Sequence, residues 1–81
     1  QSVQSRVAGV LGELAAQAIA QGAPSEGTPV IATQNDLAQL AGCTRESASR
    51  FLAVLERAGV ITQGRGRLVV NDPGGLAAYV F

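Results

Sequence analysis

Two helix-forming segments separated by a very short turn occupy the middle of this 81-residue chain. The first covers about residues 34–41, and the second begins at about residue 44 and extends to about residue 58. Only Gly-Cys-Thr stands between the two apolar patterns. Two helices joined by a three-residue turn that contains glycine are typical of a helix-turn-helix. Residues 34–58 are therefore predicted to fold in this way.

The ends of both helices carry residues that start and stop helices. Thr33 and Asp36 have the spacing of a capping box, with Asp in the place where Glu or Gln is usual. Thr44 is a favourable N-cap for the second helix. Gly42 and Gly59 follow the two helices, where glycine readily adopts the left-handed conformation that ends a helix.

The flanking segments predict another helix, a short strand and a hairpin. Apolar residues at spacings of three and four predict an amphipathic helix over about residues 2–21. Residues 21–29 hold two Pro and two Gly and are expected to form a loop, after which Val-Ile-Ala at 30–32 predicts a short strand. Residues 60–71 contain two β-prone runs around Gly-Arg-Gly, which predicts a hairpin.

The chain is predicted to close with a short helix, for which Asp72 is the N-cap and Pro73 the first helical residue. The expected order is helix, short strand, helix, turn, helix, hairpin and helix, without an internal repeat. We therefore expect a single domain over residues 1–81. Its fold class is mainly α with a small β-hairpin (α+β), which is a winged helix-turn-helix with its wing at about residues 60–71.

The second helix of the pair has two chemically different faces. Because successive residues are about 100° apart, its first turns present a polar face. That face comprises Arg45, Glu46, Ser49 and Arg50, with Ala53 further along. The opposite face is an apolar stripe that comprises Ala48, Phe51, Leu52, Leu55 and Ala58. We expect the stripe to pack on the other helices and to leave the polar face open.

The polar face has the chemistry of base recognition. Arg45 and Arg50 can each donate two hydrogen bonds to guanine, Glu46 can accept one from cytosine, and Ser49 can serve several bases. In a helix-turn-helix, the N-terminal part of the second helix enters the major groove of DNA. These four residues are the predicted base-reading set.

Four further residues are candidates for contacts to the DNA backbone. Arg65 and Arg67 lie at the predicted tip of the wing, where a flexible, basic loop suits phosphate or minor-groove contacts. Thr33 and Thr44 lie at helix N-termini, which attract phosphate groups. For Thr44 the capping role is the stronger prediction.

The charge distribution agrees with this placement, but the total charge does not. Residues 1–42 sum to −2, residues 43–71 sum to +3, and Asp72 contributes the last −1, so the net charge is zero. A nucleic-acid-binding domain usually carries a basic excess. A second hypothesis therefore stays open, in which the winged helix is a protein–protein interaction module without specific DNA binding.

The composition disfavours an enzyme, a metal site and a membrane protein. The chain has no His and a single Cys, Cys43, without a neighbouring base, and it shows no metal-ligand spacing. We expect Cys43 to be a small buried turn residue rather than a redox sensor. No apolar run reaches the roughly 18 residues that span a bilayer. No export signal precedes the first helix, so we expect a cytoplasmic protein.

The run TQNDLAQLAGCTRESASRFLAVLERAGVITQGRGRLVV, residues 33–70, resembles the C-terminal winged-helix domain of the Crp/Fnr family of bacterial transcription factors. Residues 5–15 are similar to the helix that follows the dimerisation helix in that family. The resemblance implies a homodimeric cytoplasmic regulator whose N-terminal effector-binding β-roll and dimerisation helix are absent from this chain. It implies no cofactor in this domain and an effector, cyclic nucleotide or other, in the N-terminal one. It also implies that a loop near residues 22–30 contacts RNA polymerase in activators.

The resemblance further assigns roles on the polar face. Relatives with Arg-Glu-x-x-x-Arg read a TGTGA-like half-site, and these roles would fall on Arg45, Glu46 and Arg50. Another branch reads a TTGAT-like half-site with Glu-x-x-Ser-Arg, which Glu46, Ser49 and Arg50 also match. Because Arg45 separates the two branches, we predict a TGTGA-like half-site.

Overall fold

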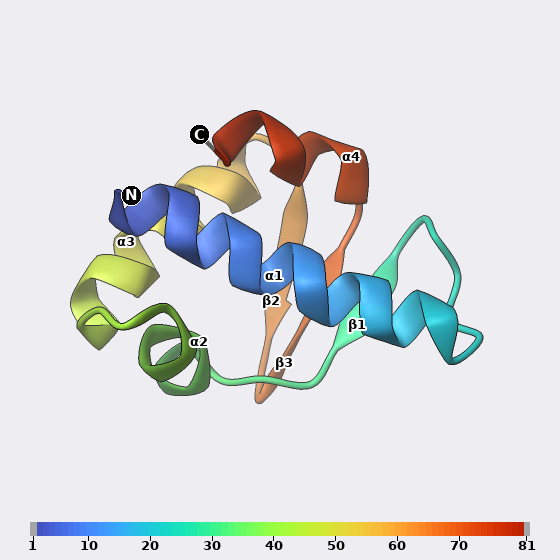
Figure 1. Cartoon of the computed structure of the whole chain (residues 1–81), viewed down its shortest axis with the longest axis horizontal. Coiled ribbons are helices and arrows are strands. Elements are labelled where there is room, and N and C mark those ends of the chain that lie inside the picture. Colours follow the sequence, from blue (N-terminus) through green and yellow to red (C-terminus); the bar gives the residue numbers. More distant parts are fainter. Residues whose placement is uncertain (1, 81) are drawn as a thin grey trace.

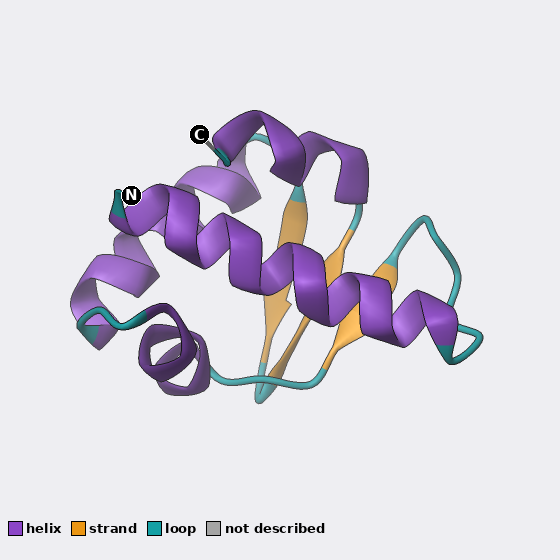
Figure 2. Ribbon diagram, viewed as in Figure 1, coloured by secondary structure: helices purple, strands orange, loops and turns teal. Residues whose placement is uncertain are grey.

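A long helix, α1, crosses in front of a small antiparallel sheet and contacts every other helix of the molecule (Figure 1). The computed structural model describes residues 2–80. The elements in chain order are α1 (Val3–Ala20), β1 (Thr28–Val30), α2 (Gln34–Ala41), α3 (Arg45–Arg57), β2 (Ile61–Gly64), β3 (Arg67–Val70), α4 (Pro73–Leu76) and the 3-10 helix η1 (Ala77–Tyr79). Figure 2 shows the three strands side by side, with α2 and α3 at one end of α1. The predicted winged helix-turn-helix is confirmed.

Local capping chemistry sets the bounds of α2 and α3. The Thr33 hydroxyl accepts a hydrogen bond from the Asp36 amide at 3.0 Å, and the Asp36 carboxylate accepts one from the Thr33 amide at 2.9 Å. The Thr44 hydroxyl accepts from the Ser47 amide at 3.1 Å. Gly42 and Gly59 have φ values of 69° and 78°, in the left-handed region where only glycine is free of strain. The predicted helix ends are therefore confirmed.

The sheet is larger than the predicted hairpin. Strands β2 and β3 form the hairpin, and β1 pairs with the other edge of β3 to give the order β1-β3-β2. The pairing of Gly64 with Arg67 leaves Arg65 and Gly66 as a two-residue turn. All three strands are antiparallel, so the wing is one side of a three-stranded sheet.

The strand predicted at residues 30–32 lies two residues earlier. Thr28 and Val30 are buried and Pro29 is exposed, which is the alternation of a strand with one face on the core. Pro29 fits because β1 is an edge strand, where a residue without an amide hydrogen breaks no ladder. Ile31 is 81% exposed and lies outside the strand. The alternation of buried and exposed residues over 28–30 therefore locates this strand better than the β-propensity of Val-Ile-Ala at 30–32.

The core lies between α1, the helix-turn-helix and the sheet. Its largest fully buried aliphatic side chains are Val7, Leu11, Leu37, Leu52, Leu55, Ile61, Val70 and Leu76. The ring of Phe51 meets that of Tyr79 edge-on, with centroids 5.5 Å apart, and this contact joins α3 to the C-terminal segment. Every element therefore contributes to one interior that fixes the orientation of α3.

Two details of the sequence prediction are wrong, and a third is confirmed in its position. Ala58 is exposed because the helix has already reached its C-cap there. The apolar residues Leu37, Leu40 and Ala41 predict the helix at residues 34–41, but Leu40 is 62% exposed. Asp72 is the N-cap of α4 and Pro73 its first residue, as predicted, although the Asp72 side chain makes no capping hydrogen bond.

Candidate nucleic-acid interface

The two faces of α3 separate as the helical periodicity predicts. Ala48, Phe51, Leu52 and Leu55 are buried beneath the helix. On the opposite face, Arg45, Glu46 and Arg50 are exposed and Ser49 is half-buried at the margin. The buried stripe anchors α3 to the core, because burial of apolar surface stabilises by about 25 cal/mol per Å². The polar side chains are thus held in place by the stripe and remain open to a partner.

The turn before α3 is held by an arginine that the sequence analysis did not single out. Arg6 on α1 donates from Nε to the carbonyl oxygen of Ala41 at 2.8 Å and from Nη2 to that of Gly42 at 3.4 Å. These carbonyls end α2, where the helix leaves its acceptors unsatisfied. The Cys43 amide donates to the Ala38 carbonyl at 2.9 Å. Because Arg6 is far from the turn in sequence, no local pattern could have indicated its role.

Cys43 itself is half-buried and packs against the core. The prediction of a small turn residue agrees with this position, although its burial is incomplete. Among residues 2–80, no three His, Cys, Asp or Glu side chains lie together as a metal-binding group. No helix in the same range has the length and apolar character needed to cross a membrane.

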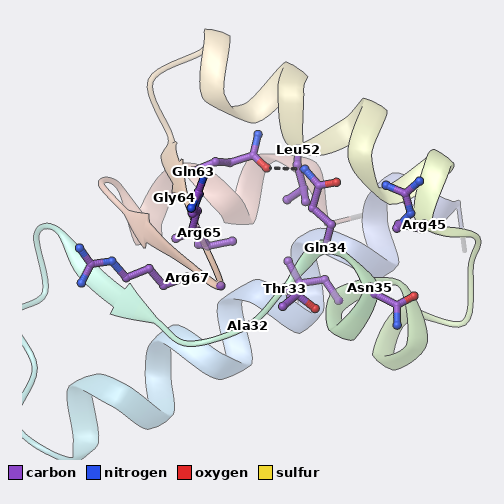
Figure 3. A pocket seen from close by; sticks show the side chains of 13 residues that line it. Ala32, Thr33, Gln34, Asn35, Arg45, Leu52, Gln63, Gly64, Arg65 and Arg67 are labelled. Carbon is purple, nitrogen blue, oxygen red and sulfur yellow. Dashed lines mark hydrogen bonds between the residues drawn. The ribbon is translucent and has the colours of Figure 1, made fainter.

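A groove runs between the start of α2, the start of α3 and the wing (Figure 3). Its polar lining consists of Thr33, Gln34, Asn35, Arg45, Gln63, Arg65 and Arg67. None of the described residues that line it carries a carboxylate. The groove therefore has three guanidinium groups and several neutral hydrogen-bonding groups around one opening, which is the chemistry that suits a polyanion.

The structure brings together four of the eight predicted site residues at this groove, namely Thr33, Arg45, Arg65 and Arg67. Arg50 lies elsewhere and lines a separate hollow with Val3 and Phe51, beside the start of α1. Arg45 and Arg50 thus leave α3 on different flanks. Asn35, which the sequence analysis missed, joins the groove from the exposed first turn of α2.

The arginines of this surface are available to a partner. Within residues 2–80, the guanidinium groups of Arg45, Arg50, Arg65 and Arg67 make no hydrogen bond or ion pair. Their exposed side chains therefore carry charge that the rest of the fold does not neutralise. Thr44 differs, because its hydroxyl accepts from the Ser47 amide and donates to the Ser47 hydroxyl at 3.0 Å. Its hydroxyl is committed to the cap.

Comparisons with known proteins place this arrangement among transcriptional regulators. The model of the Crp-like helix-turn-helix domain matches residues 5–79. The fold is similar to that of the catabolite activator protein of Thermus thermophilus, at 33% sequence identity and a TM-score of 0.78, over 98% of this chain and 34% of that one. It is also similar to a CRP/FNR family transcriptional regulator from the same organism, at 27% identity and a TM-score of 0.80, over 99% of this chain and 41% of that one.

A comparison with curated proteins finds no significant match. The chain spans well under half the length of the two Thermus thermophilus regulators.

Proposed function

The chain belongs to the family of Crp-like helix-turn-helix domains, and we propose that it binds a specific sequence of double-stranded DNA within a bacterial transcription regulator. The observation that carries this proposal is the polar face of α3, which is exposed beside a wing whose arginines bind no other group of residues 2–80. In helix-turn-helix proteins, the second helix enters the major groove through its first turns. Arg45, Glu46, Ser49 and Arg50 occupy those turns here.

The four residues of this face divide into donors and acceptors. We assign Arg45 and Arg50 as bidentate donors to guanine and Glu46 as an acceptor from cytosine. Ser49 has the smaller role, since it is half-buried and reaches less far from the helix. These contacts would supply sequence specificity, because only groups that reach base edges distinguish one base pair from another.

The contacts to the DNA backbone would come from both sides of α3. Arg65 and Arg67 approach from the wing, and Thr33 approaches from the start of α2. For Thr44 we propose that the backbone at the start of α3 makes the phosphate contact, because the hydroxyl is committed to the cap and the first amides of a helix lack partners within it.

The half-site that this face fits best is TGTGA-like. Arg45 is the supporting feature, because it is exposed on the groove side of α3 and makes no bond within the described part of the chain. Competition between duplexes with inverted TGTGA and TTGAT half-sites tests the assignment. We expect TGTGA to displace labelled DNA at the lower concentration. Displacement of the labelled DNA by the TTGAT duplex, with no displacement by the TGTGA duplex, would refute the assignment.

The complete regulator would be a cytoplasmic homodimer that places two such domains on a two-fold symmetric site. Two recognition helices about one helical turn apart match two inverted half-sites. An effector bound outside this domain would shift the relative orientation of the two copies. Contact of the loop near residues 22–30 with RNA polymerase belongs to this same proposal.

A salt titration separates DNA binding from a protein–protein role of the same surface. A protein that neutralises Z phosphates loses affinity with a logarithmic slope of about −0.9Z, because counterions are released. With Arg65 and Arg67 assigned to phosphates, we expect a slope of about −2 per domain on a labelled duplex. A slope near zero, or no binding to any duplex at low salt, would instead favour the protein-binding module.

A further inference from the structure

The wing is tied to the helix-turn-helix by three polar side chains that the proposed DNA contacts do not use. They are Glu56 near the end of α3, Gln63 on β2 and Gln34 at the start of α2. Hydrogen bonds connect them in that order, from α3 to the wing and from the wing to α2. We call this set the Glu56–Gln63–Gln34 relay.

The bond between α3 and the wing is the stronger half of the relay. The Glu56 carboxylate accepts from the Gln63 backbone amide through Oε2 at 3.0 Å and from the Gln63 side-chain amide through Oε1 at 3.1 Å. Both oxygens of one carboxylate are therefore engaged by one residue. Two hydrogen bonds to one carboxylate restrict both the position and the rotation of Gln63, and bonds to charged groups are stronger than neutral ones.

The other half of the relay crosses the floor of the groove. The Gln34 side-chain amide donates to Gln63 Oε1 at 2.9 Å, and Figure 3 shows the two side chains pointing toward each other between α2 and the wing. Gln63 thus uses its backbone amide, its side-chain amide and its side-chain oxygen within the protein. A side chain whose amide nitrogen and oxygen are both bonded in this way acts as a spacer, because its length limits the width of the groove at this point.

The wing arginines follow directly from this spacer in sequence. Gln63 is two residues before Arg65 and pairs with Leu68, the residue after Arg67. The tip of the wing is a two-residue turn with little packing of its own, since Gly64, Arg65, Gly66 and Arg67 are all exposed. The base of the wing must therefore set where the two guanidinium groups stand relative to Arg45 across the groove.

We propose that the Glu56–Gln63–Gln34 relay positions the wing arginines against DNA, and that Gln63 is a positioning residue for DNA affinity. This inference rests on the proposed function. Gln63 would not touch DNA itself; it would act through Arg65 and Arg67. A residue that only stabilised the fold would change the free energy of unfolding. It would not change how much Arg65 and Arg67 contribute to DNA affinity.

A double-mutant cycle separates these two roles. The four proteins are the unchanged chain, Gln63→Ala, the pair Arg65→Ala with Arg67→Ala, and all three substitutions together. Affinity for a labelled duplex with inverted TGTGA half-sites is measured for each, together with its salt dependence. Gln63→Ala leaves the net charge unchanged, so any change in salt slope reports on the position of the arginines. Gln39→Ala is the matched control, because Gln39 is an exposed glutamine of α2 outside the groove.

We expect Gln63→Ala to weaken binding by about fivefold in the unchanged background and by less than about twofold once the wing arginines are gone. The salt slope should become shallower in the first case only, and Gln39→Ala should bind as the unchanged chain does. Equal losses in both backgrounds, or no loss in either, would overturn the relay. If Gln63→Ala fails to fold by circular dichroism, Gln34→Ala, which removes only the outer bond, takes its place in the same cycle.

The same measurements keep the two proposals apart. If the loss of both wing arginines weakens binding while Gln63→Ala does not, the proposed function stands and the relay is wrong. If the unchanged chain binds no duplex at low salt, the proposed function is contradicted and the relay is contradicted with it.

Discussion

Arg45 and Arg50 are five positions apart on α3, so their side chains leave the helix about 140° apart. Arg45 points toward the groove beside the wing, whereas Arg50 lies beside the start of α1. Two donors on opposite flanks of one helix would reach different base pairs. Each good bidentate pair distinguishes the correct from the wrong base by about 1–3 kcal/mol. The two arginines should therefore act at separate positions of the half-site.

Arg45→Ala should remove the preference for TGTGA-like over TTGAT-like DNA. Because Glu46, Ser49 and Arg50 remain, we expect binding to TTGAT to change little, while binding to TGTGA weakens by about 1–3 kcal/mol. Fluorescence anisotropy with both duplexes at one salt concentration measures the two affinities. If the ratio of affinities stays at its original value, Arg45 does not select the half-site.

At the scale of elements, the orientation of α3 depends on contacts from α1 as well as on its own buried stripe. Arg6 satisfies two carbonyl oxygens at the end of α2, and the next residues make the turn into α3. Leu52 lies fully buried beneath the polar face. The Arg6 hydrogen bonds hold the turn, and the buried Leu52 side chain holds the body of α3. Each can be tested by its effect on the free energy of unfolding.

Arg6→Ala should lower the free energy of unfolding by about 1.5–3 kcal/mol, the range for hydrogen bonds to charged groups. Chemical denaturation followed by circular dichroism gives this quantity. The matched control is Arg65→Ala, which removes the same charge from an exposed turn and should change stability by less than about 0.5 kcal/mol. Equal stability changes in the two variants would show that Arg6 does not hold the turn.

Leu52→Ala should lower the free energy of unfolding more than substitutions at exposed positions such as Arg65→Ala do. It removes a fully buried side chain and leaves a cavity, which costs about 2–5 kcal/mol. Val54→Ala is the control on the same helix, because Val54 is 38% exposed and outside the buried stripe. Thermal unfolding should show a large fall in melting temperature for Leu52→Ala and a small one for Val54→Ala. The reverse order would contradict the assignment of the two faces.

The elements whose limits depend on neighbouring residues could be predicted from the sequence. Thr33, Asp36, Thr44 and Gly59 act on the backbone within a few residues, so capping patterns reveal them. The polar face of α3 follows from helical periodicity for the same reason. The contact of Arg6 with the turn could not be predicted, because its partners are 35 and 36 residues away.

The sheet and the groove also depend on residues far apart in the sequence, so no local pattern predicts them. The pairing of β1 with β3 joins segments that only the complete fold brings together. The Glu56–Gln63–Gln34 relay depends on three elements, and glutamine has no sequence pattern that marks such a role. Asn35 belongs to the groove for the same non-local reason.

For the whole molecule, zero net charge and DNA binding are compatible because the charges are separated in space. Five of the six arginines, Arg45, Arg50, Arg57, Arg65 and Arg67, occur on α3 and the wing beside only two carboxylates, Glu46 and Glu56, whereas Glu13 and Glu26 lie on α1 and the following loop. A neutral chain attracts distant DNA weakly, so affinity must come from close contacts. We therefore expect base readout to supply a large share of the binding free energy, and specificity should be sensitive to single residues of α3.

Arg50→Ala tests most directly the proposal that α3 contacts the bases while the wing contacts the phosphates. The measurement is the ratio of affinities for a duplex with inverted TGTGA half-sites and for a scrambled duplex, determined for the unchanged chain, Arg50→Ala and Arg65→Ala. Arg50→Ala should lower the affinity for the specific duplex by about 1–3 kcal/mol and reduce the ratio, whereas Arg65→Ala should weaken both duplexes alike and keep the ratio. Equal losses on both duplexes for Arg50→Ala would contradict the account.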